Sequence, residues 1–359
     1  MTERELHLIE NLCKANAPSG FEDETANAAR AAMEDICDVE EDSLRNLYLI
    51  RRKNTGDKPV LMLDAHSDEV GFMVHSIRPT GTLRVVALGG WNRATLPGAA
   101  VWVRNREGKW LPGVIAAKPP HFMSAAEKER QGMPEIRDLA VDVGARSAEE
   151  AETVFGVRMG EPVVPNAPFR YDEANGLFFG KAFDCRLGCA ALCEVMRRIA
   201  DEDLQIDVVG ALSAQEEVGE RGCKVSVNRI RPDAALVFEG CPADDTFGEP
   251  YAMQTKLKYG PMIRFMDNSV ISNPRFVRFA LDLAEKKGIP AQAAVREGGG
   301  NDAAVIQSQL NGAPAIVLGV PVRYIHTPAC IAAAADYEAT VELALALIRA
   351  LNESVIKAF

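Results

Sequence analysis

The spacing of apolar residues predicts two helices followed by two strands at the start of the chain. Apolar residues recur at helical intervals on either side of Pro18-Ser19-Gly20, which interrupts the pattern. They are Leu6, Ile9 and Leu12 before the break and Ala26, Ala29, Met33 and Ile36 after it. Two continuous apolar runs follow, at Leu47–Ile50 and Val60–Leu63. Such unbroken runs predict strands in the middle of a sheet that is covered on both faces.

The pattern changes between residues 76 and 169. Short β-rich runs occur here at Leu83–Leu88, Ala100–Val103 and Leu139–Val143, separated by glycines, prolines and charged residues. One short helix is predicted after Ser147, because Glu150 three residues later completes a capping box. We interpret residues 76–169 as a small β-barrel or sandwich that is inserted into a larger domain.

Strands and helices alternate again from residue 170 onwards. The predicted helices span 187–200, 274–287 and 337–351, the second with Asn273 as its N-cap before Pro274. The predicted strands span 206–212, 234–238 and 315–318. This alternation predicts an α/β fold in which a mostly parallel sheet carries helices on both faces. Residues 1–75 and 170–359 together would form this larger domain.

Composition narrows the class of protein. The chain has 359 residues, 47% of them hydrophobic, and a formal net charge of −11, which is typical of a globular protein with two or three domains. The acidic charge argues against nucleic acid and against anionic membrane surfaces as partners. No apolar stretch reaches the ~20 residues of a membrane helix, and the N-terminal residues lack the apolar segment of a signal peptide. With eight scattered cysteines, we expect a cytoplasmic protein with free thiols.

Side chains that bind metals follow four of the predicted strands. They are His66 with Asp68, Glu216 with Glu217, Glu239, and His326. Open α/β sheets bind ligands in the crevice beyond the carboxyl ends of their strands, so we expect these residues to lie near one another. Histidines and carboxylates without paired cysteines favour Zn, Co or Mn bound through nitrogen and oxygen. The adjacent acids Glu216 and Glu217 agree with this, since two neighbouring charges after a hydrophobic strand are tolerated more easily beside a cation.

Other patterns have a structural interpretation. Cys185, Cys189 and Cys193 are spaced so as to share one face of a helix, which favours core packing over an iron–sulfur cluster. The run Gly298–Gly300 lacks the lysine of a P-loop and the spacing of a dinucleotide-binding motif, so we expect no phosphate site there. A single histidine after a strand is more often a hydrogen-bonded structural residue, and only the complete set of residues favours a metal site.

Five motifs occur in order along the chain. They are His66-Ser67-Asp68-Glu69-Val70-Gly71, Phe183-Asp184-Cys185-Arg186-Leu187-Gly188, Gln215-Glu216-Glu217-Val218-Gly219, Gly299-Gly300-Asn301-Asp302-Ala303 and Arg323-Tyr324-Ile325-His326-Thr327-Pro328. With these motifs nearly the whole chain resembles the M42 family of metallo-aminopeptidases, which includes glutamyl aminopeptidases and TET-type peptidases and whose members have also been named endoglucanases. The resemblance implies a sheet core of the zinc-peptidase type and a PDZ-like insert that mediates subunit contacts. It also implies a homo-oligomer in which dimers assemble into a dodecamer.

The resemblance further implies a site for two divalent metal ions per subunit, which could be Zn, Co or Mn. Asp184 matches the carboxylate that bridges both ions. His66 and Glu239 match the other ligands of one ion, and Glu217 and His326 match those of the second. Glu239 stands where many relatives have Asp, and this difference of one methylene is a departure from the family pattern.

The reaction that the resemblance implies is hydrolysis of the N-terminal residue of a peptide substrate, with metal-bound water as the nucleophile. Glu216 matches the general base, which accepts the proton of that water and passes it to the leaving amine. Asp68 matches a carboxylate that orients a metal-binding histidine. Two dications and three carboxylates leave an excess of positive charge, which lowers the pKa of bound water to about 7. Cys185 replaces the Asp or Asn that commonly follows the bridging residue and places a thiol near the ions.

Three alternatives remain beside a metallo-aminopeptidase. A metal-dependent deacylase or carboxypeptidase could use the same core. A glycan hydrolase would need two facing acids about 5–9.5 Å apart, which the neighbours Glu216 and Glu217 cannot supply by themselves. A non-catalytic oligomeric binding module could have kept the scaffold, although the complete ligand set and the retained Glu216 argue against it.

Overall fold

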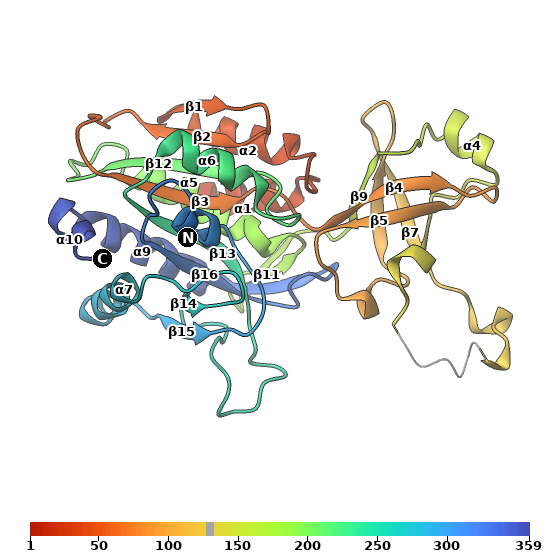
Figure 1. Ribbon diagram of the computed structural model, residues 1–359. Helices are drawn as coiled ribbons and strands as arrows, with labels where there is room; N and C mark the ends of the chain where they lie inside the picture. Colours follow the sequence, from red (N-terminus) through yellow and green to blue (C-terminus); the bar gives the residue numbers. More distant parts are fainter. Residues whose placement is uncertain (127–132) are drawn as a thin grey trace.

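The computed structural model describes residues 1–126 and 133–359. Figure 1 shows two lobes, a larger one with a sheet between helices and a smaller one built mainly of strands. Both chain termini lie in the larger lobe. None of the helices formed by the described residues has both the length and the apolar character required to cross a membrane.

The sheet of the larger lobe has a parallel centre and mostly antiparallel outer strands. Among the described residues it has eleven strands, and its parallel centre runs in the order β12 (Asp207–Ser213), β3 (Val60–His66), β13 (Ala234–Pro242) and β16 (Ala315–Arg323). The flanking strands are β1 (Cys37–Glu41), β2 (Leu47–Arg51), β17 (Cys330–Ala333), β11 (Leu177–Gly180) and β10 (Arg170–Asp172). In addition, β14 (Met262–Met266) pairs with β16, and β15 (Gln292–Val295) pairs with β14. The prediction of a parallel sheet is confirmed for this centre. The edges differ because short connections, such as that between β10 and β11, permit only antiparallel pairing.

Helices cover both faces of the sheet, as the alternation of elements predicts. One face carries five helices, α1 (Glu3–Lys14), α2 (Asp23–Met33), α5 (Phe183–Arg198), α7 (Pro274–Lys287) and α9 (Ala334–Ala350). The other face carries α6 (Arg221–Ile230) and α8 (Ala303–Ser308). The short helix α10 (Glu353–Lys357) lies at the end of the chain. Strand β3 supplies both cores, since Leu61 and Leu63 pack towards α5 while Met62 packs towards α6. This explains why the predicted run from Val60 to Leu63 has no polar position.

Two central strands are longer than predicted. Strand β13 continues past Phe238 to Pro242, and β16 continues past Leu318 to Arg323. Glycine at position 240 does not end β13 but lets the start of α5 approach it, because a Cβ atom there would lie 2.8 Å from the Cα of Asp184. Helix α5 also begins earlier than predicted, at Phe183, with non-helical backbone angles at Asp184 and Cys185. The close approach at Gly240 places Asp184 beside the carboxyl end of the sheet.

The smaller lobe is a closed β-barrel with its own hydrophobic core, which confirms the predicted barrel. Its strands are β4 (Gly71–Ile77), β5 (Leu83–Leu88), β8 (Ala140–Asp142), β7 (Trp110–Ala116), β6 (Ala100–Arg104) and β9 (Pro162–Pro165), in that order around the barrel. The short helices are η1 (Arg93–Thr95), η2 (Pro120–Phe122), η3 (Ile136–Asp138) and α4 (Ala148–Thr153). Helix α4 begins where predicted, with Ser147 Oγ accepting the backbone N–H of Glu150 at 3.1 Å.

The boundary predicted after residue 75 falls inside β4. Strand β4 already belongs to the barrel at its first residues, since Gly71 pairs with Leu88 of β5 and Phe72 with Val163 of β9. At the other end, the barrel strands finish at Pro165. We therefore propose that the inserted domain spans residues 71–165.

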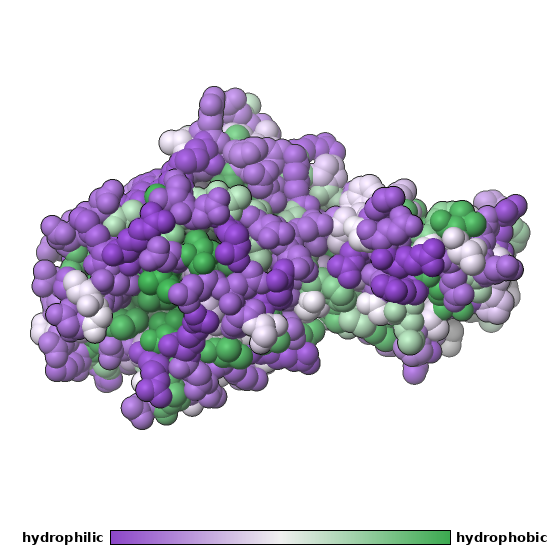
Figure 2. Space-filling view, turned by 90° about the horizontal axis from the view of Figure 1, so that it is seen from above, coloured by the Kyte–Doolittle hydropathy of each residue, from purple (hydrophilic) through white to green (hydrophobic). Residues whose placement is uncertain are grey.

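The barrel exposes large apolar side chains. Phe122, Val154 and Met159 have 75%, 74% and 75% of their surface exposed. Figure 2 shows hydrophobic side chains among polar ones on the surface of the smaller lobe. Side chains of this size are enriched in surfaces that contact other proteins.

Candidate metal and catalytic site

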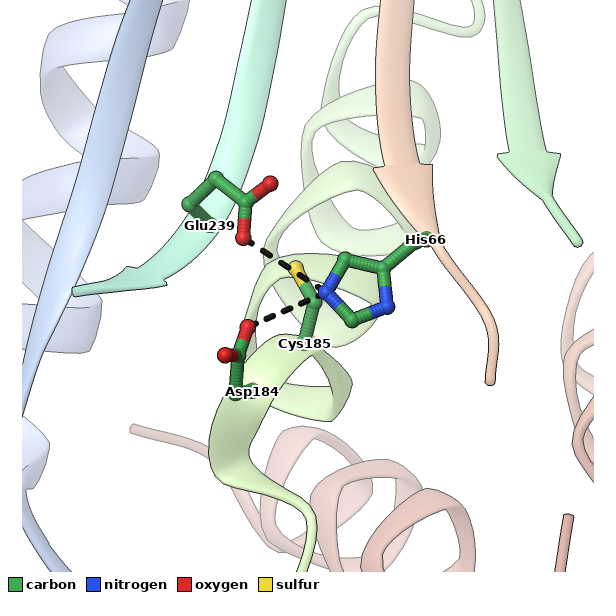
Figure 3. Close-up of side chains that lie close together, drawn as sticks. All are labelled: His66, Asp184, Cys185 and Glu239. Atoms are coloured by element: carbon green, nitrogen blue, oxygen red, sulfur yellow. Dashed lines mark hydrogen bonds and ion pairs between the residues drawn. The ribbon is translucent and has the colours of Figure 1, made fainter. Parts of the chain in front are cut away.

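His66 is the last residue of β3 and is 2% exposed. Its Nε2 lies 3.0 Å from Asp184 Oδ1 and 3.6 Å from Glu239 Oε2. Figure 3 shows both carboxylates pointing towards this one ring nitrogen, from the start of α5 and from β13. The other ring nitrogen, Nδ1, lies 3.2 Å from the carbonyl oxygen of Asp68 and 3.5 Å from its Oδ1. Three elements thus converge on one imidazole.

Asp184 lies between the two histidines of the predicted site. Its Oδ1 faces His66 Nε2 at 3.0 Å, and its Oδ2 faces His326 Nε2 at 3.1 Å. His326 follows β16, and its Nε2 also lies 3.4 Å from Glu217 Oε1. The structure therefore brings together all five residues predicted as metal ligands. One carboxylate oxygen per histidine is the arrangement that a bridging carboxylate requires.

Asp68 holds the turn that carries Glu216 and Glu217. It is fully buried, and its Oδ1 accepts the backbone N–H of Glu216 at 2.9 Å. Its Oδ2 accepts the N–H of Glu217 at 3.2 Å and the hydroxyl of Ser19 at 2.5 Å. The ligand atoms of His66, Glu216 and Glu217 lie within 4.8 Å of one another. One side chain thus links the orientation of His66 to the position of both acids.

The charges of the site are strongly coupled. Burial alone would raise the pKa of Asp184, but hydrogen bonds with His326 and His66 outweigh it and hold that pKa below its usual range. Burial would likewise lower the pKa of His326, but Asp184 and Glu217 raise it to about 11. The pKa of His66 is also raised, because neighbouring carboxylates outweigh its burial. Without cations, both imidazoles therefore carry protons that balance the carboxylates.

The remaining acids have raised pKa values because they are buried beside one another. Burial raises the pKa of Glu239 to about 7, against the opposing effect of His66. The pKa of Glu216 is raised well above its usual value, first by burial and then by the nearby carboxylates of Glu239 and Glu217. Acids crowded in this way repel one another as anions, and bound cations relieve that repulsion.

The donors fit divalent metal ions. One group of ligand atoms within 4.8 Å of one another comes from His66, Asp184, Cys185 and Glu239, and a second comes from Asp184, Glu217 and His326. Glu217 Oε1 is buried and makes no close hydrogen bond among the described residues; its charged neighbour is His326 Nε2 at 3.4 Å, which is also a candidate ligand atom. Imidazole nitrogens with carboxylate oxygens are the donors that Zn, Co and Mn take.

Two of the three clustered cysteines pack as predicted, and the third lies at the site. Cys189 and Cys193 are buried in the core of α5. Cys185 is equally buried, but it belongs to the His66 group of donors, as expected from its place after Asp184. Its thiol donates to the carbonyl oxygen of Phe238 at 3.0 Å, and burial raises its pKa. The thiol is thus protonated and hydrogen-bonded in the ion-free site.

A cavity of about 430 Å³ opens over these side chains. Its wall includes three residues that the sequence analysis did not select, namely Gly90 of the barrel, Arg264 and Arg296, together with the run Gly298–Gly300, to which the sequence analysis gave no place in the site. Arg264 pairs with Asp267 at 2.7 Å, and Arg296 pairs with Asp244 at 2.7 Å. Arg264 could have been noticed in the sequence, because it is a charged residue inside the otherwise apolar strand Met262–Met266. The place of the glycine run in this wall depends on the order of the strands in the sheet, which the sequence pattern alone did not give.

A second buried cluster lies beside the first and was also missed. Asp64, Cys223 and Asp302 have ligand atoms within 4.8 Å of one another. Ser213 Oγ donates to Asp64 Oδ1 at 2.6 Å, whereas the carboxyl oxygens of Asp302 have no hydrogen-bond partner among the described residues. Burial, followed by the nearby Asp64, raises the pKa of Asp302 well above its usual value. Asp302 thus brings the motif Gly299–Ala303 next to Asp64 of β3, the strand that carries His66.

Metal loading should release protons. The raised pKa values mean that His66 and His326 are protonated at pH 7 in the ion-free protein, and an imidazole must be neutral to bind a metal. We expect Zn²⁺ binding to release at least two protons per chain, from the two imidazoles and in part from Glu239, whose pKa is about 7, and to weaken as the pH falls. Calorimetric titration at pH 7 in two buffers of different ionisation enthalpy measures this number. An apparent enthalpy that does not depend on the buffer would contradict the expectation.

Comparisons with known proteins cover both lobes. A family model described as M42 glutamyl aminopeptidase matches residues 46–343. The glutamyl aminopeptidase of Lactococcus lactis subsp. cremoris is 33% identical over 345 residues, which are 96% of this chain and 96% of that protein. A TET aminopeptidase from a marine sediment archaeon (Thaumarchaeota) superposes with a TM-score of 0.95 and 36% identity over 99% of each chain. The TET1 peptidase of Pyrococcus horikoshii, described as able to assemble into a tetrahedron or a large octahedral shell, superposes with a TM-score of 0.86 and 29% identity over 97% of this chain and 100% of that chain.

Proposed function

The chain belongs to the M42 peptidase family and is a peptide hydrolase, and from this premise we propose that it is a two-metal aminopeptidase that removes N-terminal residues from peptides. The observation that carries the proposal is the position of Asp184. Its two carboxylate oxygens face two different histidines at 3.0 and 3.1 Å, with Glu216 beside the same group of donors. This arrangement supports one ion on each side of Asp184 and a base next to both.

Five residues would hold the ions. His66 and Glu239 would bind one, Glu217 and His326 the other, and Asp184 would bind both. When bound, the ions supply a Lewis acid for the scissile carbonyl and lower the pKa of a water molecule so that it is nucleophilic at neutral pH. Asp68 keeps Nδ1 of His66 in place, so that its Nε2 faces the ion.

Glu216 would move the proton. Its carboxylate accepts a proton from the attacking water and then gives that proton to the nitrogen of the leaving amine. The hydrogen bond from its backbone N–H to Asp68 keeps the residue beside the donors. Burial supports this role, because it raises the pKa of Glu216 towards the range in which a carboxylate accepts a proton readily.

The proposal can be tested by comparing a peptide that has a free N-terminal amino group with the same peptide after N-acetylation. We expect a short peptide to be cleaved when its N-terminus is free and to resist cleavage when the same peptide is N-acetylated, because an aminopeptidase must bind the terminal amine beside the acids of the cavity. Chromatographic product analysis measures this, and chelation followed by Zn, Co or Mn should abolish and restore the activity. Equal cleavage of both peptides would support the carboxypeptidase alternative, and release of acetate from the acetylated peptide would support the deacylase alternative. Hydrolysis of laminarin that survives chelation would support a glycan hydrolase.

We also propose a homo-oligomer, in which dimers assemble further, and a cytoplasmic location. The assembly of the P. horikoshii relative supports the first, together with the apolar side chains that the barrel exposes, among them Phe122 and Met159. The eight cysteines, all free and buried, support a reducing compartment. The barrel would then serve both subunit contact and the route to the site, since Gly90 lines the cavity.

A further inference from the structure

The turn that carries Glu216 is held from two sides. Asp68 accepts the N–H groups of Glu216 and Glu217, as described above. The preceding residue, Gln215, has a φ of +57°, in the left-handed region that few side chains adopt. Its N–H donates to Glu22 Oε1 at 3.1 Å. Two carboxyl groups thus hold three consecutive N–H groups of this turn.

Glu22 is an unusual residue to find at this place. It directly precedes α2 and is completely buried, and it forms no ion pair among the described residues. Its Oε1 also accepts the N–H of Gly20 at 2.7 Å, while its Oε2 has no hydrogen-bond partner within residues 1–126 and 133–359. Burial, followed by the nearby Asp68, raises the pKa of Glu22 to about 7. Burying a carboxyl group without an ion-pair partner lowers the stability of the fold. We therefore ask what role Glu22 has in the site.

We propose that Glu22 is a positioning residue for Glu216, which it serves by fixing the backbone of Gln215. This inference rests on the proposed function, in which Glu216 is the base. The side chain of Glu216 leaves the chain one residue after Gln215, so a shift of the Gln215 peptide changes where the Glu216 carboxylate lies. A displacement of about 1 Å in such a group lowers a rate by about 100-fold.

The segment that carries Glu22 is firmly anchored. Ser19 donates to Asp68, and Ala17 exchanges hydrogen bonds with Glu69, donating to its side chain at 3.1 Å and accepting its N–H at 3.0 Å. Glu69 is in turn paired with buried Lys181 at 2.5 Å. Phe21, beside Glu22, packs under the guanidinium of Arg104 from the barrel at 4.7 Å. These contacts fix the position of the segment from Ala17 to Glu22, and so the carboxyl group of Glu22 can hold the backbone of Gln215 in place.

The test compares two variants of Glu22 with a matched control. Glu22→Ala removes the acceptor, and we expect kcat to fall about 10- to 100-fold with KM and metal content unchanged. Glu22→Gln keeps an oxygen acceptor, and we expect kcat within about threefold of wild type. The control is Asp207→Ala, since Asp207 is also buried and accepts the N–H groups of Thr55 at 2.9 Å and Gly56 at 2.6 Å, but at the opposite end of β12. It should lower the melting temperature and leave kcat unchanged.

A double variant separates positioning from a general structural effect. In the Glu216→Gln background, Glu22→Ala should cause no further loss of kcat, because a residue that acts through the base then has nothing to act on. Multiplying effects, a Gln variant as slow as the Ala variant, or wild-type kcat in Glu22→Ala would overturn the inference. If Glu22→Ala does not fold, Glu22→Asp, which withdraws the carboxylate by one methylene, takes its place with the same expectations. Failure of the proposed function would look different, since Glu216→Gln alone would then keep the wild-type rate.

Discussion

Replacement of Glu216 by Gln is expected to lower kcat at least about 100-fold, the scale of lost acid–base catalysis, while the metal content stays at the wild-type level. Gln has the same size and still accepts a hydrogen bond, but it cannot take a proton from water. Asp68 binds the backbone of this residue and not its side chain, so the turn should keep its shape. Steady-state kinetics with a free-amine peptide and elemental analysis of the purified protein measure the two quantities.

The metal content decides between two roles for Glu216. Its carboxylate lies within 4.8 Å of donors from His66 and Glu217, so its position alone would also suit a metal ligand. Loss of metal in Glu216→Gln would therefore make it a ligand, and a wild-type rate would remove it from the mechanism. Glu220→Gln is the matched control, because Glu220 belongs to the same loop but does not line the cavity. It should leave both quantities unchanged.

The site residues that lie at strand ends could be predicted from the pattern of apolar and polar residues in the sequence. His66 and the pair Glu216 and Glu217 follow apolar runs, and parallel strands bring their carboxyl ends to one edge of the sheet. In the structure, His66 of β3 is directly paired with Ser213 at the end of β12, as this reasoning requires. The individual roles came from the family resemblance, since a strand end does not distinguish a base from a ligand.

The parts that depend on contacts between distant segments could not be placed from the pattern of apolar and polar residues, and of these only Asp184 was found, through the family resemblance. Asp184 lies at the start of a helix, and its position depends on the absence of a side chain at Gly240. Glu22 precedes α2 in a polar stretch, where an acid normally faces solvent, and only the packing of the N-terminal segment against the turn buries it. Arg264 reaches the cavity because β14 pairs with β16, an antiparallel edge that the alternation of helices and strands did not predict.

Asp184→Asn should have the largest effect on metal content of any single substitution. An amide has one oxygen in place of two, so it cannot face His66 and His326 with an oxygen each, as Asp184 does at 3.0 and 3.1 Å. It also removes a negative charge that balances both ions. We expect most of the bound metal to be lost and kcat to fall about 1000-fold or more, because the Lewis acid and the activated water are lost together.

Each histidine variant should cause about half of the metal loss expected for Asp184→Asn. His66→Ala and His326→Ala each remove the imidazole of one ion, so each is expected to reduce the metal content by about one of two ions per chain while the other is retained. Elemental analysis after gel filtration measures all three variants, with His75→Ala as the control, since His75 is exposed on β4 and its side chain forms a hydrogen bond with Ser76 Oγ at 3.1 Å. Full metal content in Asp184→Asn would refute a bridging carboxylate. Complete loss in both histidine variants would mean that the ions bind cooperatively, each holding the shared Asp184 carboxylate in the position that the other ion needs.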